Sequence, residues 1–319
     1  MELISPEVVE AALRTLHAQI KPITDGTVWN HIPELGSADP DSFGIAVVGM
    51  SGRRYHAGDA METLTMQSVS KPFVYALVLA ELGAEVVDRW VRAEPSGDAF
   101  NAISLEAGTG RPANAMINAG AIVASGLVPG ATQDERFRRI LDWFSACAGR
   151  RLQMDEAVYA SELATGDRNK ALAYLIRSHG ALPGSGLDAL DLYLRQCAVQ
   201  VTTSDLAVMA ATLANGGVNP VTGENVMPEP VTVQTLAVMA TCGMYDGAGD
   251  WLVRVGLPAK SGVSGAVLAA CPDRFGVAVY SPPLDRVGNS VRAVAALREM
   301  SENYGLHMLH NPGPTQAGT

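Results

Sequence analysis

Short apolar runs separated by turn residues occur near both ends of the chain. The run 43–48 predicts a buried strand, and the Gly-Met-Ser-Gly segment at 49–52 turns it into a second strand over 53–57. A similar pair of strands is predicted over 263–270 and 275–280. We expect the two hairpins to pair in one antiparallel sheet, although they lie more than 200 residues apart.

Apolar residues with helical spacing predict helices before, between and after these strands. A first helix begins at Pro6 and keeps Val9, Leu13, Leu16 and Ile20 on one face, and a last helix spans about 290–304. Residues 21–42 resemble a loop, rich in Pro, Asp and Gly. A helical block runs from Ser68 to about Thr241, with helices over 167–177, 188–200 and 204–215 and one opened by the Thr132-x-x-Glu135 capping box.

These elements predict an α+β protein, in which the terminal helices cover the sheet and the helical block is a long insertion. We expect a single catalytic domain over 1–305, with an α/β part at about 1–65 and 250–305 and a helical part at about 66–249. The functional site is expected in the crevice between the two parts. Residues 306–319 are predicted to form a flexible tail.

Composition narrows the possible partners and compartments. The 319 residues are 48% hydrophobic and 18% charged, which supplies a full core. The net charge of −10 argues against nucleic acid or an anionic membrane surface as a partner. Four separated cysteines indicate reduced thiols rather than a metal site or a disulfide framework, and we expect no metal and no organic cofactor. Without a recognisable export signal or an apolar span of about 18 residues, a cytoplasmic location is expected.

Ser68 and Lys71 form the pattern Ser-x-x-Lys at the start of an apolar run that ends at Leu79. A spacing of three residues places both side chains on one face of a helical turn, and Pro72 fixes that turn as the first of its helix. A serine becomes nucleophilic when a neighbouring base accepts its proton, and a buried lysine can be that base. Taken alone, this short pattern is more often a surface serine beside a solvated lysine.

A second motif makes the catalytic interpretation stronger. Lys260-Ser261-Gly262 precedes the predicted strand 263–270, and Lys-Ser-Gly on a strand accompanies Ser-x-x-Lys in penicillin-recognising acyl transferases. Two of the four lysines of the chain lie in these two motifs. The pair indicates an enzyme that forms a serine acyl intermediate.

Several longer strings show that the chain resembles the serine-dependent glutaminases, a bacterial-type family with a β-lactamase-like, DD-peptidase-like fold. The resemblance covers roughly residues 20–305, whereas penicillin-binding proteins share only the two short motifs. It rests on Gln67-Ser-Val-Ser-Lys71, Met116-Ile-Asn-Ala-Gly-Ala-Ile122, Ser161-Glu-Leu-Ala-Thr-Gly-Asp-Arg-Asn169, Met209-Ala-Ala-Thr-Leu-Ala-Asn-Gly-Gly217, Cys242-Gly-Met-Tyr-Asp246, Gly256-Leu-Pro-Ala-Lys-Ser-Gly-Val263 and Ser281-Pro-Pro-Leu-Asp285. It implies hydrolysis of L-glutamine to L-glutamate and ammonia, and a homodimer or homotetramer.

The resemblance also implies roles for single residues. Ser68 matches the nucleophile and Lys71 its base, and the backbone N–H of Val263 joins that of Ser68 in an oxyanion hole. The other matching positions bind the amino acid substrate or lie close to the nucleophile: Asn118, Glu162, Asn169, Tyr193 and Tyr245, with Gln67, Lys260 and Ser261 in supporting positions. Either tyrosine can be the proton donor to the departing ammonia. In isolation, the glutamate would be a solvated helix residue, the asparagines helix caps and the tyrosines half-buried core residues.

One position departs from the family. His31, in Trp-Asn-His-Ile-Pro, stands where the family usually has a tyrosine, at a loop expected to border the site. Imidazole is shorter and titrates near neutrality, so we expect this exchange to affect substrate affinity and pH dependence. Two alternatives follow from the same residues: a penicillin-binding or β-lactam-hydrolysing enzyme, and a catalytically silent protein that binds glutamine.

Overall fold

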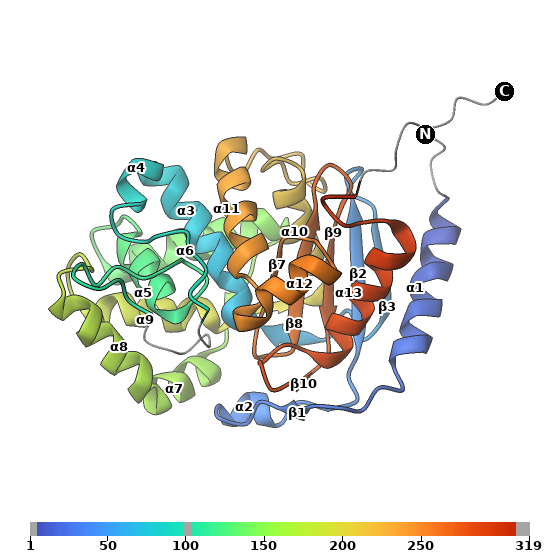
Figure 1. Ribbon diagram of the computed structural model, residues 1–319, viewed down its shortest axis with the longest axis horizontal. Coiled ribbons are helices and arrows are strands. Elements are labelled where there is room, and N and C mark those ends of the chain that lie inside the picture. The colour runs from blue at the N-terminus through green and yellow to red at the C-terminus, as the bar shows by residue number, and fades with distance from the viewer. Residues whose placement is uncertain (1–4, 98–103, 311–319) are drawn as a thin grey trace.

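The central feature of the computed structural model, which describes residues 5–97 and 104–310, is a five-stranded antiparallel sheet of order β3-β2-β9-β8-β7 (Figure 1). Strand β2 pairs with β9 with Ile45 opposite Val279, so the two distant hairpins share one sheet, as predicted. The strands are β2 Gly44–Gly49, β3 Arg54–Gly58, β7 Ala259–Ser261, β8 Ala266–Cys271 and β9 Phe275–Tyr280.

One predicted strand boundary is wrong. The strand expected from residue 263 begins at Ala266, and the preceding edge strand β7 contains Lys260 and Ser261. A tight turn separates the two strands because the Gly262 N–H donates to the Ala266 carbonyl and Gly265 adopts a φ of +98°. Such a φ favours glycine, which has no Cβ to clash.

Helices cover both faces of the sheet, because its strands alternate apolar side chains toward two cores. Ile45 and Val47 of β2 lie in the core that also contains residues of α1 Pro6–Ile20, α12 Ala248–Arg254 and α13 Val291–Tyr304. Ala46 and Val48 point into the larger core on the side of α10 Thr203–Ala214. The expected cover of terminal helices is thus present on one face, and α10 completes a three-layer arrangement.

Helix α10 approaches the sheet at Gly276 of β9 more closely than a side chain would allow. A Cβ built at Gly276 would lie 2.0 Å from the Ala211 nitrogen and 2.4 Å from the Ala207 carbonyl oxygen. The glycine is therefore required by packing rather than by its backbone conformation.

The helical block lies beside the sheet, where α11 contacts β7 and α6 contacts α10 (Figure 1). Its α-helices are α3 Lys71–Leu82, α4 Ala84–Val87, α5 Asn118–Leu127, α6 Gln133–Ala148, α7 Glu156–Thr165, α8 Asp167–Ser178, α9 Gly186–Cys197 and α11 Glu229–Cys242. The block is not wholly helical, since β5 Gln153–Met154 and β6 Val199–Thr202 form a small sheet with β4 Thr63–Thr65. The helix predicted over 188–200 is wrong at its end, because the β-branched run after Cys197 pairs with β4.

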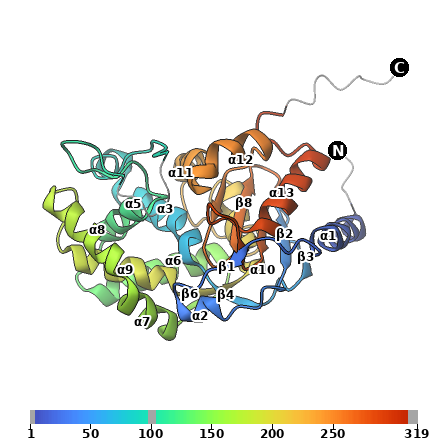
Figure 2. The same ribbon diagram turned by 60° about the horizontal axis from the view of Figure 1, so that its bottom comes forward.

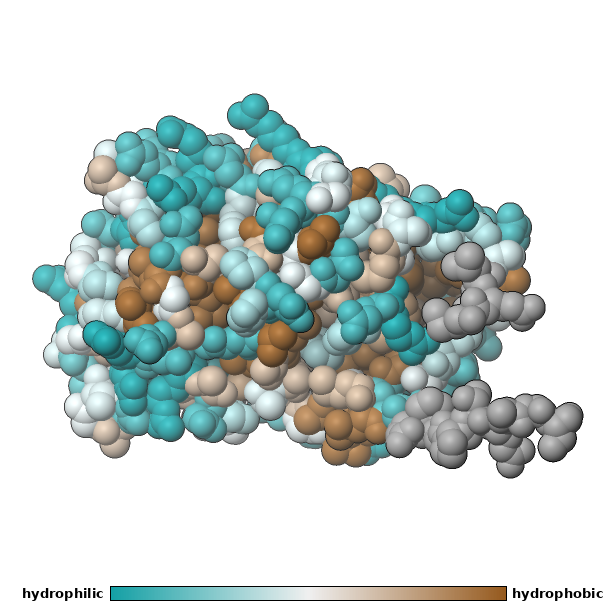
Figure 3. All heavy atoms as spheres, turned by 90° about the horizontal axis from the view of Figure 1, so that it is seen from above, coloured by the Kyte–Doolittle hydropathy of each residue, from teal (hydrophilic) through white to brown (hydrophobic). Residues whose placement is uncertain are grey.

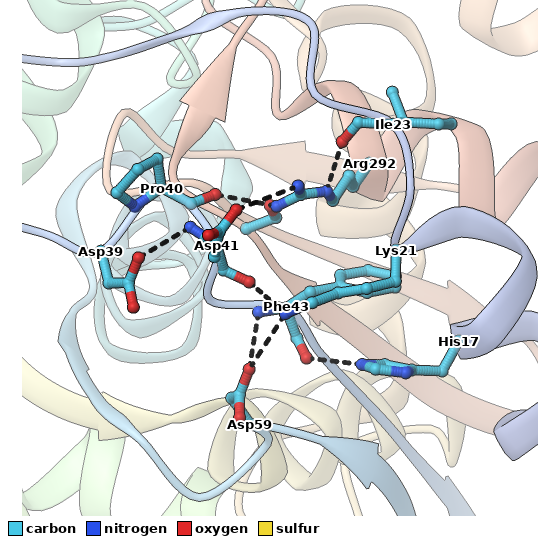
Figure 4. Close-up of polar contacts among 10 residues, drawn as sticks. His17, Lys21, Ile23, Asp39, Pro40, Asp41, Phe43, Asp59 and Arg292 are labelled. Atoms are coloured by element: carbon cyan, nitrogen blue, oxygen red, sulfur yellow. Dashed lines mark hydrogen bonds and ion pairs between the residues drawn. The ribbon is translucent and has the colours of Figure 1, made fainter.

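The N-terminal loop contains two short elements that the sequence did not predict. Strand β1 Thr27–Val28 pairs with β10 Pro283–Leu284, and α2 Pro33–Gly36 lies beside α7 (Figure 2). The buried Arg292 of α13 holds both ends of this loop, donating to the carbonyls of Ile23 at 2.7 Å and Pro40 at 2.8 Å (Figure 4). Guanidinium donors fixed in this way leave the loop little freedom at its ends.

On the face seen from above, hydrophobic residues form separate patches interrupted by hydrophilic ones (Figure 3). Among the described residues, no helix is both long and apolar enough to cross a bilayer. All four cysteines are buried and free. Of the predicted tail, Leu306 packs into the core around α13, and residues 311–319 lie outside the described residues.

Candidate active site

The Ser-x-x-Lys motif lies where the sheet meets the helical block. Ser68 belongs to a 3-10 turn, η1 Gln67–Ser70, and the α-helix predicted to open on Ser68 begins instead at Lys71. Pro72 stands in the first turn of α3, as predicted. Lys71 Nζ lies 2.8 Å from Ser68 Oγ, and both side chains are buried. Gln67 adopts a φ of +48°, so the turn before the serine is strained.

Burial changes the chemistry of Lys71. Besides its contact with Ser68, Lys71 Nζ donates a hydrogen bond to Asn118 Oδ1 at 2.7 Å. Desolvation lowers the pKa of Lys71 to about 8, although the Cys197 and Glu162 side chains act in the opposite direction. A neutral lysine can donate one N–H to Asn118 and still offer its lone pair to the Ser68 hydroxyl.

Asn118 joins three of the predicted site residues. It is the first residue of α5, and its Oδ1 also accepts a hydrogen bond from the Tyr193 hydroxyl of α9 at 3.1 Å. Its Nδ2 lies 3.1 Å from Asn169 Oδ1 on α8. Burial raises the pKa of Tyr193, so this phenol stays protonated and remains a donor. The amide of Asn118 is therefore held in one orientation by its neighbours.

Glu162 is a buried carboxylate on α7. Gln67 Nε2 donates to its Oε1 at 2.6 Å. Burial raises the pKa of Glu162 to about 7, and the hydrogen bond from Gln67 and the charge of Lys71 partly oppose this shift. A ligand cation placed beside Glu162 would favour its ionised form.

Tyr245 and Lys260 meet at one carbonyl oxygen. The Tyr245 hydroxyl donates to the Ser261 carbonyl at 3.0 Å, and Lys260 Nζ donates to the same oxygen at 2.7 Å and to the Gly243 carbonyl at 3.0 Å. Lys260 Nζ also lies 4.4 Å from the centre of the Tyr245 ring. Tyr245 has a φ of +58° and opens the short 3-10 helix η2 Tyr245–Gly247. The strained tyrosine is thus fixed at both its ring and its hydroxyl.

Burial raises the pKa of Tyr245, while hydrogen bonds with Ser68 and Ser261 act in the opposite direction. Burial, followed by the charge of Lys71, lowers the pKa of Lys260 well below its usual range. Both groups therefore favour their neutral forms. The Ser68 hydroxyl therefore lies between the neutral phenol of Tyr245 and the amine of Lys71, whose charged form is disfavoured by burial.

Two backbone N–H groups are available near the serine. Val263 lies in the turn between β7 and β8, and this turn is packed against η1, since a Cβ at Gly262 would lie 3.2 Å from the Met66 carbonyl oxygen. Among the described residues, neither the Ser68 nor the Val263 N–H donates to a backbone carbonyl. Such free donors are what a developing oxyanion requires.

His31 stands apart from the other predicted residues. Its ring stacks on Trp29 with centroids 4.2 Å apart, and it is exposed. No hydrogen bond within the described residues joins it to another predicted site residue. The loop is nevertheless held close to the site, because Glu34 Oε1 accepts a hydrogen bond at 2.6 Å from Ser161, the neighbour of Glu162.

Comparison of the sequence with models of known protein families identifies the family of the chain that carries this set of residues. The family model described as Glutaminase matches residues 26–309. The chain belongs to the glutaminase family. The predicted enzyme class, a hydrolase that acts on a linear amide, is confirmed.

Individual relatives of this family member agree with that assignment. It is 46% identical over 305 residues to a glutaminase of Trichormus variabilis, and the match covers 96% of the chain and 91% of that protein. It is 51% identical over 287 residues to Glutaminase 1 of Bradyrhizobium diazoefficiens, where the match covers 90% of the chain but only 47% of the relative.

Solved structures of glutaminases have the same fold. The probable glutaminase ybaS superposes with a TM-score of 0.94 at 35% identity, over 97% of this chain and 100% of that one. A probable glutaminase from Bacillus subtilis, complexed with 6-diazo-5-oxo-L-norleucine, superposes with a TM-score of 0.87 at 33% identity, over 97% of this chain and 98% of that one.

The sequence interpretation missed a second group of buried polar residues behind the nucleophile turn. Ser70, Ser125 and Gln196 are fully buried and hydrogen-bonded to one another. A glutamine among the apolar positions of α9 and a serine among those of α5 were the available signals. Without the tertiary structure, neither could be connected to Ser68.

Proposed function

We propose that this glutaminase family member hydrolyses L-glutamine to L-glutamate and ammonia through a γ-glutamyl ester on Ser68. The observation that carries the proposal is the 2.8 Å contact between the buried Lys71 amine and the Ser68 hydroxyl. The lowered pKa of Lys71 supports its role as the base. The relative from Bacillus subtilis was solved with 6-diazo-5-oxo-L-norleucine, a diazo-ketone analogue of glutamine, which supports the substrate.

The polar groups around Ser68 match a zwitterionic amino acid. In this proposal, Glu162 binds the α-ammonium group, and the raised pKa of its carboxyl falls when that cation arrives. Asn118 and Asn169 supply amide donors for the α-carboxylate without adding a competing charge. The side-chain carboxamide then points toward Ser68 and the N–H groups of Ser68 and Val263. Each such donor is worth about 3–4 kcal/mol of transition-state stabilisation in related acyl transfers.

We assign proton delivery to Tyr245 rather than Tyr193. The hydroxyl of each tyrosine donates a hydrogen bond, Tyr193 to Asn118 and Tyr245 to the Ser261 carbonyl, but only Tyr245 is also hydrogen-bonded with Ser68, the residue that carries the reacting group. Lys71 takes the Ser68 proton as the oxygen attacks the carboxamide carbon, and Tyr245 passes a proton to the nitrogen as the C–N bond breaks. The protonated Lys71 then returns its proton to the Tyr245 phenolate, so both groups are neutral again when ammonia leaves. In the second half of the reaction, Lys71 takes a proton from water as the water oxygen attacks the ester carbon, and it gives this proton to Ser68 Oγ as the ester C–O bond breaks and glutamate is released.

The architecture supports a β-lactamase-like fold, since an edge strand with Lys-Ser-Gly flanks a Ser-x-x-Lys turn beside an antiparallel sheet. The decisive experiment measures ammonia and glutamate from L-glutamine for the wild type and Ser68→Ala. Equimolar products from the wild type and none from the variant are expected. Activity in the folded variant would assign the nucleophile elsewhere. Acylation by labelled penicillin instead of glutamine turnover would favour a β-lactam-recognising enzyme.

A further inference from the structure

A chain of buried hydrogen bonds runs behind the nucleophile turn and plays no part in the proposed chemistry. The Ser70 hydroxyl donates to the Gln67 carbonyl at 2.7 Å, and Gln196 Nε2 donates to Ser70 Oγ at 3.2 Å. The Ser125 hydroxyl lies 3.0 Å from Gln196 Oε1 and 2.8 Å from the Ala121 carbonyl oxygen. Ser70, Ser125 and Gln196 are all 0% exposed. Each bond therefore lies in a medium where an unpaired partner is costly.

The direction of these bonds fixes the Gln196 amide. A serine hydroxyl has one proton, and Ser70 gives it to the Gln67 carbonyl, so only lone pairs of Ser70 Oγ face Gln196. The NH₂ group of Gln196 must then point to Ser70 and its oxygen to Ser125, whose single proton is shared between that oxygen and the Ala121 carbonyl oxygen. An apolar residue of the same size could fill this volume, but it could not donate to Ser70.

The chain connects the same three elements that position the proposed site. Ser125 lies seven residues after Asn118 on α5, two helical turns along the same face. Gln196 lies three residues after Tyr193 on α9. Ser70 lies two residues after Ser68 in η1. At the proposed site, Asn118 of α5 is hydrogen-bonded to Lys71, which follows η1, and to Tyr193 of α9. On the side away from Ser68, Gln196 of α9 joins η1 and α5 a second time, through Ser70 and Ser125.

The strained Gln67 explains why such support matters. A non-glycine residue at a φ of +48° persists only when its surroundings hold it. Its carbonyl is held by Ser70, and its side chain is held by Glu162 at 2.6 Å. If the carbonyl is released, the turn can relax, and both the Ser68 hydroxyl and the Ser68 N–H move with it.

We propose that Gln196 is a positioning residue for glutamine hydrolysis, which acts through Ser70 to hold the strained Gln67–Ser68 turn in its reactive conformation. This role rests on the proposed function, in which Ser68 is the nucleophile. It differs from a purely structural role, in which the same bonds would add stability without affecting the reaction.

The test compares Gln196→Met with Thr212→Val. Methionine keeps the volume and removes the donor. Thr212 is also fully buried, and its hydroxyl oxygen lies 3.0 Å from the carbonyl oxygens of both Val208 in α10 and Cys147 in α6, outside the site. Ser125→Ala is a milder second variant that removes the partner of Gln196 Oε1. Thermal unfolding, kcat, KM for L-glutamine and amide hydrogen exchange of η1 are measured for all three.

We expect Gln196→Met to lower kcat about 10- to 100-fold with KM changed less than about threefold, because a small displacement of the nucleophile affects the reaction more than binding. Its η1 amides should exchange faster than those of the wild type. Ser125→Ala should show a smaller loss of the same kind. Thr212→Val should lose similar stability with kcat and η1 exchange unchanged.

Equal kcat and equal η1 exchange in Gln196→Met and Thr212→Val would overturn the proposal and leave Gln196 with a structural role. A wild type without glutamine turnover, combined with faster η1 exchange in Gln196→Met alone, would instead reject the proposed function. In that case the bonds would still hold the turn, but the positioning role in hydrolysis would be rejected with the function. If Gln196→Met does not fold, the kcat and exchange of Ser125→Ala decide between the two roles.

Discussion

If Lys71 is the base, the rate of Ser68 acylation must follow the fraction of Lys71 that is neutral. Burial lowers the pKa of Lys71 from 10.5 to about 8. At pH 7, about one molecule in ten then has a neutral lysine, against about one in three thousand for an ordinary lysine. The structural cause is desolvation, since the side chain is 1% exposed. The difference corresponds to about 3 kcal/mol in favour of the neutral amine.

The assay is rapid-quench measurement of acylation between about pH 5.5 and pH 10, with 6-diazo-5-oxo-L-norleucine labelling of Ser68 as an independent readout of nucleophilicity. We expect the rate to rise about tenfold per pH unit below pH 7 and to level off above about pH 8 to 9. Lys71→Arg should abolish the reaction at every pH, because a guanidinium stays charged.

A wild-type rate that is constant from about pH 6 to pH 9 would refute the assignment of Lys71 as the base. So would a Lys71→Arg variant that still acylates Ser68 at a comparable rate. A rate that rises with an apparent pKa near 10.5, the ordinary lysine value, would keep Lys71 as the base but contradict the claim that burial lowers its pKa.

Four other outcomes follow from the structure. The pKa of Lys71 is lower in the folded protein than in the unfolded chain, so the unfolded chain binds more protons between about pH 8 and 10.5. The free energy of unfolding should therefore rise with pH across this window. Urea unfolding of the wild type, compared with that of Lys71→Met, measures this rise. Lys260→Met leaves the Gly243 and Ser261 carbonyls without this donor and should lower the free energy of unfolding in urea by about 1–3 kcal/mol. The same variant should lower kcat by a larger factor than it changes KM. Glu162→Gln should raise KM for glutamine about 10- to 100-fold in steady-state assays, unlike Glu156→Gln on the exposed face of α7. Gly276→Ala should destabilise the protein by about 3 kcal/mol or more in urea, whereas Gly249→Ala, which meets open space, should not.

Much of the fold could be predicted because its signals are local. The apolar runs of β2 and β9, with their flanking turn residues, indicate strands without knowledge of their partners. The terminal helix at Pro6 is indicated by proline and apolar spacing in the same way. The end of α9 could not be predicted, since residues 199–202 become a strand only because β4 lies beside them.

The reactive pair is also local. Ser68 and Lys71 are three residues apart, so a helical turn places both side chains on one face, and in the structure Nζ lies 2.8 Å from Oγ. The sequence strings further indicated which distant residues belong with them. What the sequence did not indicate was how deeply the pair is buried, and burial is what changes the pKa of Lys71.

The tertiary structure alone decided the long-range contacts. Gln67 and Glu162 are 95 residues apart in the chain, and Ser70 and Gln196 are 126 apart, yet both pairs are hydrogen-bonded in the buried site. Such contacts depend on how helices pack against a sheet, which no local pattern specifies. The sequence by itself therefore determined which groups can react, whereas packing determined their protonation, their orientation and the strain of the turn that holds them.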